Sequence, residues 1–568
     1  MSRPTRWRNS PAQHGAQDGL RLDTRGPLFW IRAVAAVALG LLITIWSPNY
    51  YVTVVAAMAL PVVMGRYALA TVVFFAITAR EAPAGRGFDY VTMLGSQLFN
   101  QGKIPPINFL VVSALLVAIV RLRRRGVRLL IGRAAWLLLG CLSALALLTF
   151  VVGILYGQSV FSAANQNSRN FALAAMGVLA GLLIMVFPEE IKAVKLAVVS
   201  GLGILVIAAV FAVATGQAAD DRVSRYFTYY DSALPAVATA VFGALLVSRS
   251  RLTWPAGLTM GLSLTLVLIG FRLTIWLAAF VVLALAVLLS RWWTAIGRRS
   301  AISAVALVAC LLILPGMLSD VTGRVSGASS AAPAAAKAAP RSTPTAPRAN
   351  TSATATATPG ETVKGTAPGP NASTKGTATP AGKVTAKGDA GDGGVGHDVA
   401  AESSEGHLQD IRIAWSYVRE DFWTGIGPQH PQLPGLASNK TRVLYVHDEW
   451  LLDWLRFGPG SVVLVTAFLL IVALLAIRTL AERTASAMRR TAAIFGLLTP
   501  ISLLAFPYLS ESNQWPILLG IAAGILAAAS RETEKESPKR NARHSAGNGN
   551  NQAPPPLPSL VSGRAGPA

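Results

Sequence analysis

A histidine followed by two acidic residues is the strongest candidate for proton transfer in this sequence. His447, Asp448 and Glu449 come shortly before the apolar block 462–477. The ordinary pKa of histidine lies close to neutrality, so an imidazole can take a proton from a hydroxyl group. We therefore interpret His447 as a general base supported by Asp448 and Glu449. The simpler alternative is a structural histidine.

Four arginines near the ends of apolar blocks form a second candidate group: Arg169, Arg222, Arg225 and Arg272. A guanidinium is planar, stays charged and binds phosphate through two parallel hydrogen bonds. Together on the outer face of a membrane, they would suit a lipid diphosphate. The alternatives are pairing with Asp220, Asp221 or Asp231 for Arg222 and Arg225, and a snorkelling side chain for Arg272.

The familiar cofactor motifs are missing. The sequence has no Walker lysine motif, no GxGxxG loop and no His/Cys spacing of a metal site, so we predict neither cofactor nor metal. Cys141 and Cys310 both fall in apolar blocks, which favours core residues over a disulfide. The segment 47–51 lacks the acidic residues expected of a metal- and polyprenyl-phosphate-dependent glycosyltransferase. Glu81 and Asp89 keep that alternative open.

The elements that must position these residues are membrane helices. The chain is 53% hydrophobic and 14% charged, whereas soluble proteins carry about 25% charged residues. Its apolar residues form uncharged blocks such as 134–155 and 196–214, and a span needs about 20 such residues. Backbone groups in lipid must bond internally, which favours helices. We predict an all-α polytopic membrane protein of about 12–14 transmembrane helices, with one long extracytoplasmic loop containing amphipathic helices.

The basic residues that give the chain its net charge of +23 are also placed as expected for a membrane protein. Basic residues cluster at the ends of apolar blocks, as in 121–133, 291–299 and 478–490, which is the positive-inside pattern. This placement argues against a nucleic-acid partner. It predicts a multi-pass protein of the bacterial cytoplasmic membrane with both termini inside. The predicted spans are 29–46, 50–65, 67–79, 106–120, 134–156, 170–187, 193–214, 233–248, 254–270, 273–290, 300–316, 457–477, 491–507 and 515–530.

The chain divides by composition. The predicted parts are a basic tail (1–28), a bundle of about 11 spans (29–316), an Ala/Thr/Pro-rich extracytoplasmic insertion without a core (317–404), a helical extracytoplasmic loop (405–456), about three further spans (457–530) and a cytoplasmic tail (531–568). In the helical loop, apolar spacing predicts amphipathic helices at 408–421 and 446–456 on the outer membrane surface. The glycine-rich segment 424–428 separates them.

The motifs of this loop resemble those of the O-antigen ligase and O-antigen polymerase superfamily. The loop contains Arg412-Ile-Ala-Trp415, then Thr424-Gly-Ile-Gly-Pro428, His447-Asp-Glu-Trp-Leu451 and Phe457-Gly-Pro-Gly460. The segments 165–170, 222–234 and 271–272 are also similar to the family pattern, and the likeness covers roughly residues 150–480. Asp448 replaces the usual asparagine and Phe271 the usual serine, and the long insertion is unusual.

The resemblance implies a metal-independent, inverting glycosyl transfer from a polyprenyl-diphosphate-linked glycan, in the manner of cell-envelope or exopolysaccharide synthesis. It implies that His447 acts on the acceptor hydroxyl and that Arg272, with Arg222 or Arg225, holds the diphosphate. Arg169 would assist binding, and Arg412 and Asn167 would support the site. The acceptor would be a lipid, glycan or wall hydroxyl, and the sequence does not separate polymerase from ligase. The alternative outside this class is a flippase or another transporter.

Overall fold

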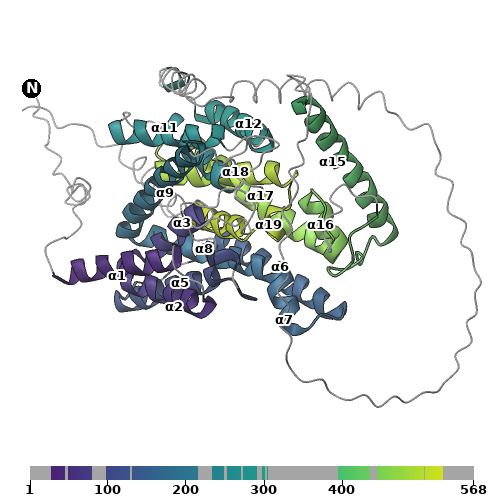
Figure 1. The fold of residues 1–568 in the computed structure, drawn as a ribbon, viewed down its shortest axis with the longest axis horizontal. Helices are drawn as coiled ribbons and strands as arrows, with labels where there is room; N and C mark the ends of the chain where they lie inside the picture. Colours follow the sequence, from purple (N-terminus) through teal and green to yellow (C-terminus); the bar gives the residue numbers. More distant parts are fainter. Residues whose placement is uncertain are drawn as a thin grey trace, which may run out of the picture. The chain divides into compact units, whose positions relative to one another are not determined.

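The computed structural model describes residues 27–44, 49–79, 97–100, 102–127, 131–214, 233–248, 253–269, 273–290, 395–434, 444–504 and 506–528, with a few isolated positions. All regular elements within these ranges are helical (Figure 1). Contacts divide the chain into two units, Met1–Leu318 with Gly406–Ala568, and Ser319–Glu405. The predicted insertion 317–404 and both predicted tails lie almost wholly outside the described residues.

The helices follow one another along the chain with short turns between many of them. In order they are α1 (Pro27–Thr44), α2 (Tyr50–Met64), α3 (Ala68–Thr78), α4 (Gln97–Asn100), α5 (Pro106–Arg124), α6 (Arg133–Leu155), α7 (Val160–Ser162), α8 (Arg169–Val186), α9 (Pro188–Ala214), α10 (Ala233–Leu246), α11 (Trp254–Ile269), α12 (Leu273–Ser290), α15 (Val395–Glu420), α16 (Glu449–Phe457), α17 (Pro459–Ala481), α18 (Ala487–Leu503) and α19 (Tyr508–Glu511). A last apolar helix covers Gln514–Ala528.

Six described helices are long and apolar enough to cross a membrane: Tyr50–Thr78, Pro106–Arg124, Arg133–Leu155, Val160–Val186, Pro188–Ala208 and Pro459–Ala481. Five shorter apolar helices accompany them, so the structure supports a membrane protein. The total of about 12–14 spans stays a prediction, and the predicted span 300–316 lies outside the described residues apart from two positions.

The predicted spans 50–65 and 67–79 correspond to two helices, α2 and α3, which a short 3₁₀ turn at Gly65–Tyr67 joins. Together they form one apolar stretch of 29 residues, Tyr50–Thr78. Pro61 has no N–H to give to the helix, and Gly65 adopts a φ of 54°, which ends α2. The predicted break between the two helices is confirmed.

Glycines bring α8 and the last helix into close contact. A Cβ added to Gly177 would lie 2.7 Å from the carbonyl oxygen of Ile517, and one added to Gly520 would meet the carbonyl of Ala174. Gly181 and Gly524 meet in the same way one turn further on. Small residues four apart are the usual means by which membrane helices approach backbone to backbone.

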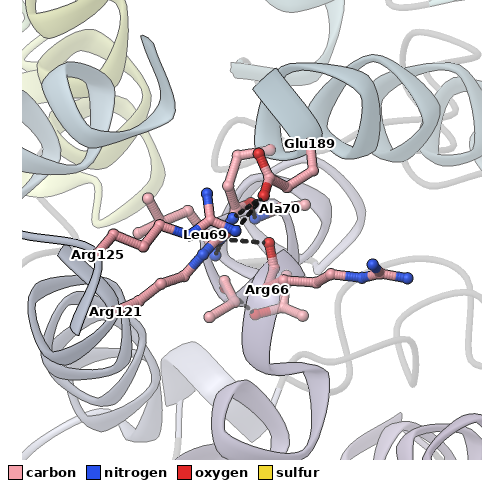
Figure 2. Close-up of polar contacts among 9 residues, drawn as sticks. Arg66, Leu69, Ala70, Arg121, Arg125 and Glu189 are labelled. Atoms are coloured by element: carbon pink, nitrogen blue, oxygen red, sulfur yellow. Dashed lines mark hydrogen bonds and ion pairs between the residues drawn. The ribbon is translucent and has the colours of Figure 1, made fainter. Parts of the chain in front are cut away.

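An ionic cluster joins α3, α5 and α9 at one end of the bundle, and Figure 2 shows Arg121 and Arg125 meeting at Glu189. Arg121 and Arg125 each place a guanidinium nitrogen 2.6 Å from a Glu189 carboxylate oxygen. The neighbouring Glu190 is fully buried and accepts the backbone N–H groups of Leu69 and Ala70, at 3.3 and 3.2 Å. A carboxylate there satisfies free N–H groups in the first turn of α3.

Candidate functional site

A buried aspartate holds the candidate base His447. The Oδ2 atom of Asp410 lies 2.9 Å from Nδ1 of His447. Asp410 is fully buried, whereas 22% of the His447 side chain is exposed. An imidazole that donates Nδ1–H to a carboxylate keeps its basic lone pair on Nε2. The pair therefore has the geometry of an oriented general base.

A second contact fixes the histidine ring from another direction. The ring of Tyr445 meets that of His447 edge to face, with their centroids 5.1 Å apart. Tyr445 is itself held by Gln432, whose Oε1 accepts its backbone N–H at 2.8 Å and whose Nε2 donates to its carbonyl at 3.1 Å. The strand-like segment 444–447 is thus locked to the loop that precedes it.

Asp410 reaches the histidine because of the way α15 packs. Ala414 and Val418 follow Asp410 at four-residue intervals, so all three share one face of the helix, and all three are buried. Ala414 and Val418 belong to a small apolar core whose other buried members are Leu433, Leu444, Val446, Leu452 and Leu455. This core joins α15 to α16 and presents Asp410 to His447.

Helix α16 begins later than the sequence predicted. Asp448 is its N-cap and accepts the backbone N–H of Leu451 at 2.8 Å, so the helix starts at Glu449. The prediction of a helix beginning near Val446, with His447 on its apolar face, is wrong. An aspartate side chain ends the extended segment before the helix, and His447 stays outside it. Asp448 is therefore a capping residue next to the base.

Glu449 links α16 to the short helix α19. Its side chain is fully buried, and its two carboxylate oxygens accept the backbone N–H groups of Leu509 and Ser510, each at 2.9 Å. Burial raises the pKa of Glu449 well above its ordinary value, and the nearby Asp453 carboxyl raises it further. The structure gives Glu449 a positioning role, since it holds the loop at 508–513 against α16.

Asp453 lies one turn after Glu449 and is also fully buried. Neither of its carboxyl oxygens has a hydrogen-bond partner among the residues that the structure describes. Burial raises the pKa of Asp453 to about 7, while the charge of Arg456 opposes the shift. Arg456 forms an ion pair with Glu511 instead, with an N–O distance of 2.7 Å. An isolated buried carboxyl of this kind is most stable when protonated.

Arg169 is the one candidate arginine whose surroundings the structure describes. It opens α8 after a π-helical turn at Ala163–Ser168, and such turns are frequent at functional sites. Its guanidinium donates to the side-chain oxygens of Asn513 at 2.7 Å and Asn165 at 3.2 Å. These two amide oxygens orient the guanidinium.

The same short loop contacts both candidate regions. Asn170 donates to the carbonyl of Ser510 at 2.7 Å, and Arg169 reaches Asn513 in that loop. Glu449 binds the loop from the other side through Leu509 and Ser510. The structure therefore connects Arg169 to the His447 segment through residues 509–513, although it brings no direct contact between them.

Two predicted supporting residues have other surroundings. Asn167 is buried and donates to Oε1 of Gln158 at 2.6 Å, which ties the π-helical turn to the end of α6. Arg412 is exposed and lies two residues after Asp410, which puts it on roughly the opposite face of α15. The structure does not bring Arg412 to His447. Arg222, Arg225 and Arg272 lie outside the described residues.

Asp410 is the site residue that the sequence analysis missed. A signal was present, because Asp410 stands at the spacing of the buried residues Ala414 and Val418 on an amphipathic helix. A charged residue on the apolar face of a helix needs a buried partner. Its partner lies 37 residues further along the chain, beyond any local pattern.

The described site offers acid–base chemistry on a hydroxyl group. Among the described residues, no group of three or more His, Cys, Asp or Glu side chains is placed to hold a metal ion. No family model matches the sequence, and a comparison with curated proteins also found no match. The functional argument therefore depends on the residues and their geometry.

Proposed function

We propose that this protein is a membrane glycosyltransferase of the O-antigen ligase or polymerase type. It moves a glycan from a polyprenyl-diphosphate donor to an acceptor hydroxyl on the outer side of the bacterial cytoplasmic membrane. The observation that carries the proposal is the hydrogen bond of 2.9 Å between buried Asp410 and partly exposed His447. This pair lies in the segment between two groups of apolar helices, α1–α12 and α17–α18.

The proposed reaction begins with proton transfer to His447. Its Nε2 takes the proton of the acceptor hydroxyl, and Asp410 stabilises the imidazolium that results. The acceptor oxygen attacks the anomeric carbon from the face opposite the diphosphate, and a new glycosidic bond forms with inversion. The bond from that carbon to the diphosphate oxygen breaks, and polyprenyl diphosphate leaves with the electron pair.

The proposed arginines act on the leaving group. Arg272, with Arg222 or Arg225, binds the diphosphate and stabilises the charge that develops on it. Arg169 adds a further cation from the start of α8, where asparagine side-chain oxygens hold its guanidinium. Because guanidinium groups supply this charge, the proposed reaction needs no metal. Helices α15 and α16 cover the site and exclude water.

Two other functions remain as outcomes of the experiment. A flippase would use charged groups within the bundle. The partly buried Arg121 there, however, is already paired with Glu189 and Glu190, at 2.6 and 3.5 Å. The buried Glu190 also accepts a backbone N–H of α3. A polyprenyl-phosphate-dependent glycosyltransferase would depend on Glu81 and Asp89, which lie outside the described residues. Neither function requires the Asp410–His447 pair.

The proposal is tested in a strain that lacks this gene and carries wild type, His447→Ala or Arg272→Ala in its place. We expect both variants to reach wild-type amounts in the membrane while surface glycan stays unpolymerised or unattached on gels. Glu420→Gln, at an exposed position on α15, is the matched control and should restore normal glycan.

Normal glycan with both variants would overturn the proposed site. In that case, accumulation of the lipid-linked donor on the inner side in the gene-deleted strain would favour a flippase. Loss of glycan with Glu81→Gln or Asp89→Asn would favour the polyprenyl-phosphate-dependent enzyme.

A further inference from the structure

Helix α15 carries an exposed stripe opposite its buried face. Leu408 and Trp415 on α15, and Phe422 in the turn directly after it, are exposed at seven-residue intervals, and Arg412 and Arg419 lie on the same side of the helix. Trp423 follows directly and is 80% exposed. A stripe of large apolar and aromatic residues mixed with arginine is unusual on a surface that contacts only water.

The aromatic rings of this stripe continue onto α16. Phe422 meets Trp423 and Trp454 with centroid distances of 5.0 Å in each case, and Trp415 meets Trp454 at 5.9 Å. The Nε1–H of Trp454 donates to the carbonyl of Phe422 at 2.9 Å. We call Trp415, Phe422, Trp423 and Trp454 the aromatic patch. It forms one connected surface built from two elements.

The aromatic patch adjoins the apolar surface of a membrane helix. Trp450, one turn before Trp454, donates its Nε1–H to Thr466 at 3.1 Å. Thr466 lies in the second turn of α17, at the edge of an exposed apolar stripe formed by Val463, Leu470, Leu474 and Ile477. A stripe of that kind on a helix long enough to span a membrane faces lipid. The surface of α16 is therefore continuous with a lipid-facing surface.

The turn that carries Phe422 and Trp423 rests on the ends of two such helices. Tyr156, directly after α6, donates its hydroxyl to the carbonyl of Gly425 at 2.8 Å. The carbonyl of Trp423 packs against Gly458, the cap of α17, where a Cβ would lie 2.6 Å away. The backbone of Trp423, the most exposed tryptophan of the patch, thus lies beside the start of α17, and the turn that carries it contacts the end of α6.

We infer that the aromatic patch and the two arginines dock on the phospholipids of the outer leaflet. Tryptophan and phenylalanine suit the boundary between headgroups and acyl chains, and arginine suits the phosphates just above it. Continuity with the lipid-facing surface of α17 favours lipid over a glycan chain as the occupant. The inference does not rest on the proposed transferase activity.

Docking on lipid would hold the buried face of α15 at a constant distance from the membrane surface. Asp410 and Arg412 lie on roughly opposite faces of this helix, so lipid contact on one side leaves Asp410 pointing towards His447 on the other. The outer leaflet then acts as one of the supports of the Asp410–His447 pair.

The first experiment measures lipid contact directly. In full-length protein carrying Cys141→Ser and Cys310→Ser, a fluorophore is attached at Trp423→Cys or, as control, at Glu420→Cys. The protein is reconstituted in phosphatidylglycerol–phosphatidylcholine vesicles containing spin-labelled phosphatidylcholine. We expect quenching at position 423 several-fold stronger than at position 420. Equal, weak quenching at both positions would overturn the inference.

A second arm distinguishes lipid from glycan. If aqueous iodide quenches position 423 strongly, and the strain's own surface polysaccharide protects it while spin-labelled lipid has no effect, the patch binds glycan and the inference is wrong. Wild-type protein is tested in parallel with a photoreactive phosphatidylglycerol, which needs no substitution. Adducts within 408–423 support lipid docking, and their absence, with adducts present on α17, contradicts it.

Discussion

The pairing of His447 with Asp410 is the contact on which the proposed chemistry depends. A histidine without a partner on Nδ1 exists in two neutral tautomers and turns freely. The carboxylate of Asp410, at 2.9 Å, favours the tautomer that carries its proton on Nδ1. Its negative charge also stabilises the imidazolium that forms when Nε2 takes a proton. In the proposed reaction, Asp410 is thus a positioning residue, and His447 is the group that touches the acceptor.

We expect Asp410→Asn to lower the rate of glycan transfer by about 100-fold or more, which is the range of acid–base contributions. The acceptor KM should change little, because Asp410 does not touch the substrate, and Asp410→Glu should recover part of the rate. The measurement is kcat and KM of the reconstituted protein. Asp421→Asn, an exposed change at the end of α15, should leave both constants unchanged. A wild-type kcat in Asp410→Asn would remove the pair from the mechanism.

Asp453 makes stability depend on pH. Burial raises its pKa from 3.8 to about 7, so between these values the folded protein keeps a proton that the unfolded chain releases. Stability from this group is therefore greatest below about pH 4 and falls as the pH rises to about 7. The cost above that pH comes from an unpaired buried charge.

Asp453→Asn should remove this dependence, because an amide of the same shape does not ionise. We expect the variant to have a higher Tm than wild type at pH 8 and a smaller difference from wild type at pH 5, measured in the same lipid. Asp421→Asn should follow the wild-type curve at both pH values. If Asp453→Asn shows the same difference in Tm between pH 5 and pH 8 as wild type, another group causes the pH dependence.

At the scale of elements, close packing of α8 against the last helix depends on paired glycines. Gly177 and Gly181 meet Gly520 and Gly524 across the contact, where backbone carbonyls occupy the space that a Cβ would need. A carbonyl on a packed helix moves only with the whole helix. The loop 509–513, which joins the two candidate regions, lies just before this last helix.

We expect Gly520→Ala to destabilise the protein by about 1–3 kcal/mol, the range for overpacked sites. The same change at Gly140, on α6, meets nothing within 4 Å and should be neutral or slightly stabilising, because alanine favours helix. Thermal unfolding of both variants in one detergent or lipid provides the comparison. Equal Tm values for the two variants would indicate that the helices separate easily at Gly520.

At the scale of the whole molecule, the proposed chemistry requires His447 to face away from the cytoplasm. The arginines at the end of α5 and the loop around Gln429 should then lie on opposite sides of the membrane. Arg124 and Gln429 are both exposed, so cysteines at these positions report the orientation without disturbing the core.

In protein carrying Cys141→Ser and Cys310→Ser, we expect an impermeant maleimide to label Gln429→Cys on intact cells. Arg124→Cys should become labelled only after the membrane is opened, as the positive-inside pattern predicts. The reverse result would place the Asp410–His447 pair in the cytoplasm, and the proposed use of an outer-leaflet glycan donor would then fail.

Composition and periodicity were sufficient to predict a helical membrane protein. Long uncharged blocks led to apolar helices because backbone groups in lipid must bond within their own helix. Local rules also placed the amphipathic segments, since residues 408–420 fall within α15 and Gly425 and Gly427 adopt the positive φ values of a turn, 66° and 93°. These features depend on neighbouring residues, so periodicity and composition are sufficient to predict them.

The contacts between side chains that are distant in the sequence could not be predicted and are known only from the folded structure. Asp410 contacts His447, which lies 37 residues further along the chain, and Glu449 binds backbone N–H groups of a segment 60 residues away. Arg412 is exposed on the other side of α15, although it lies only two residues from Asp410. Each outcome depends on how α15, α16 and α19 pack, and packing is set by apolar contacts between distant segments. The start of α16 shows the same limit, because the side chain of Asp448 ends the extended segment and leaves His447 outside the helix.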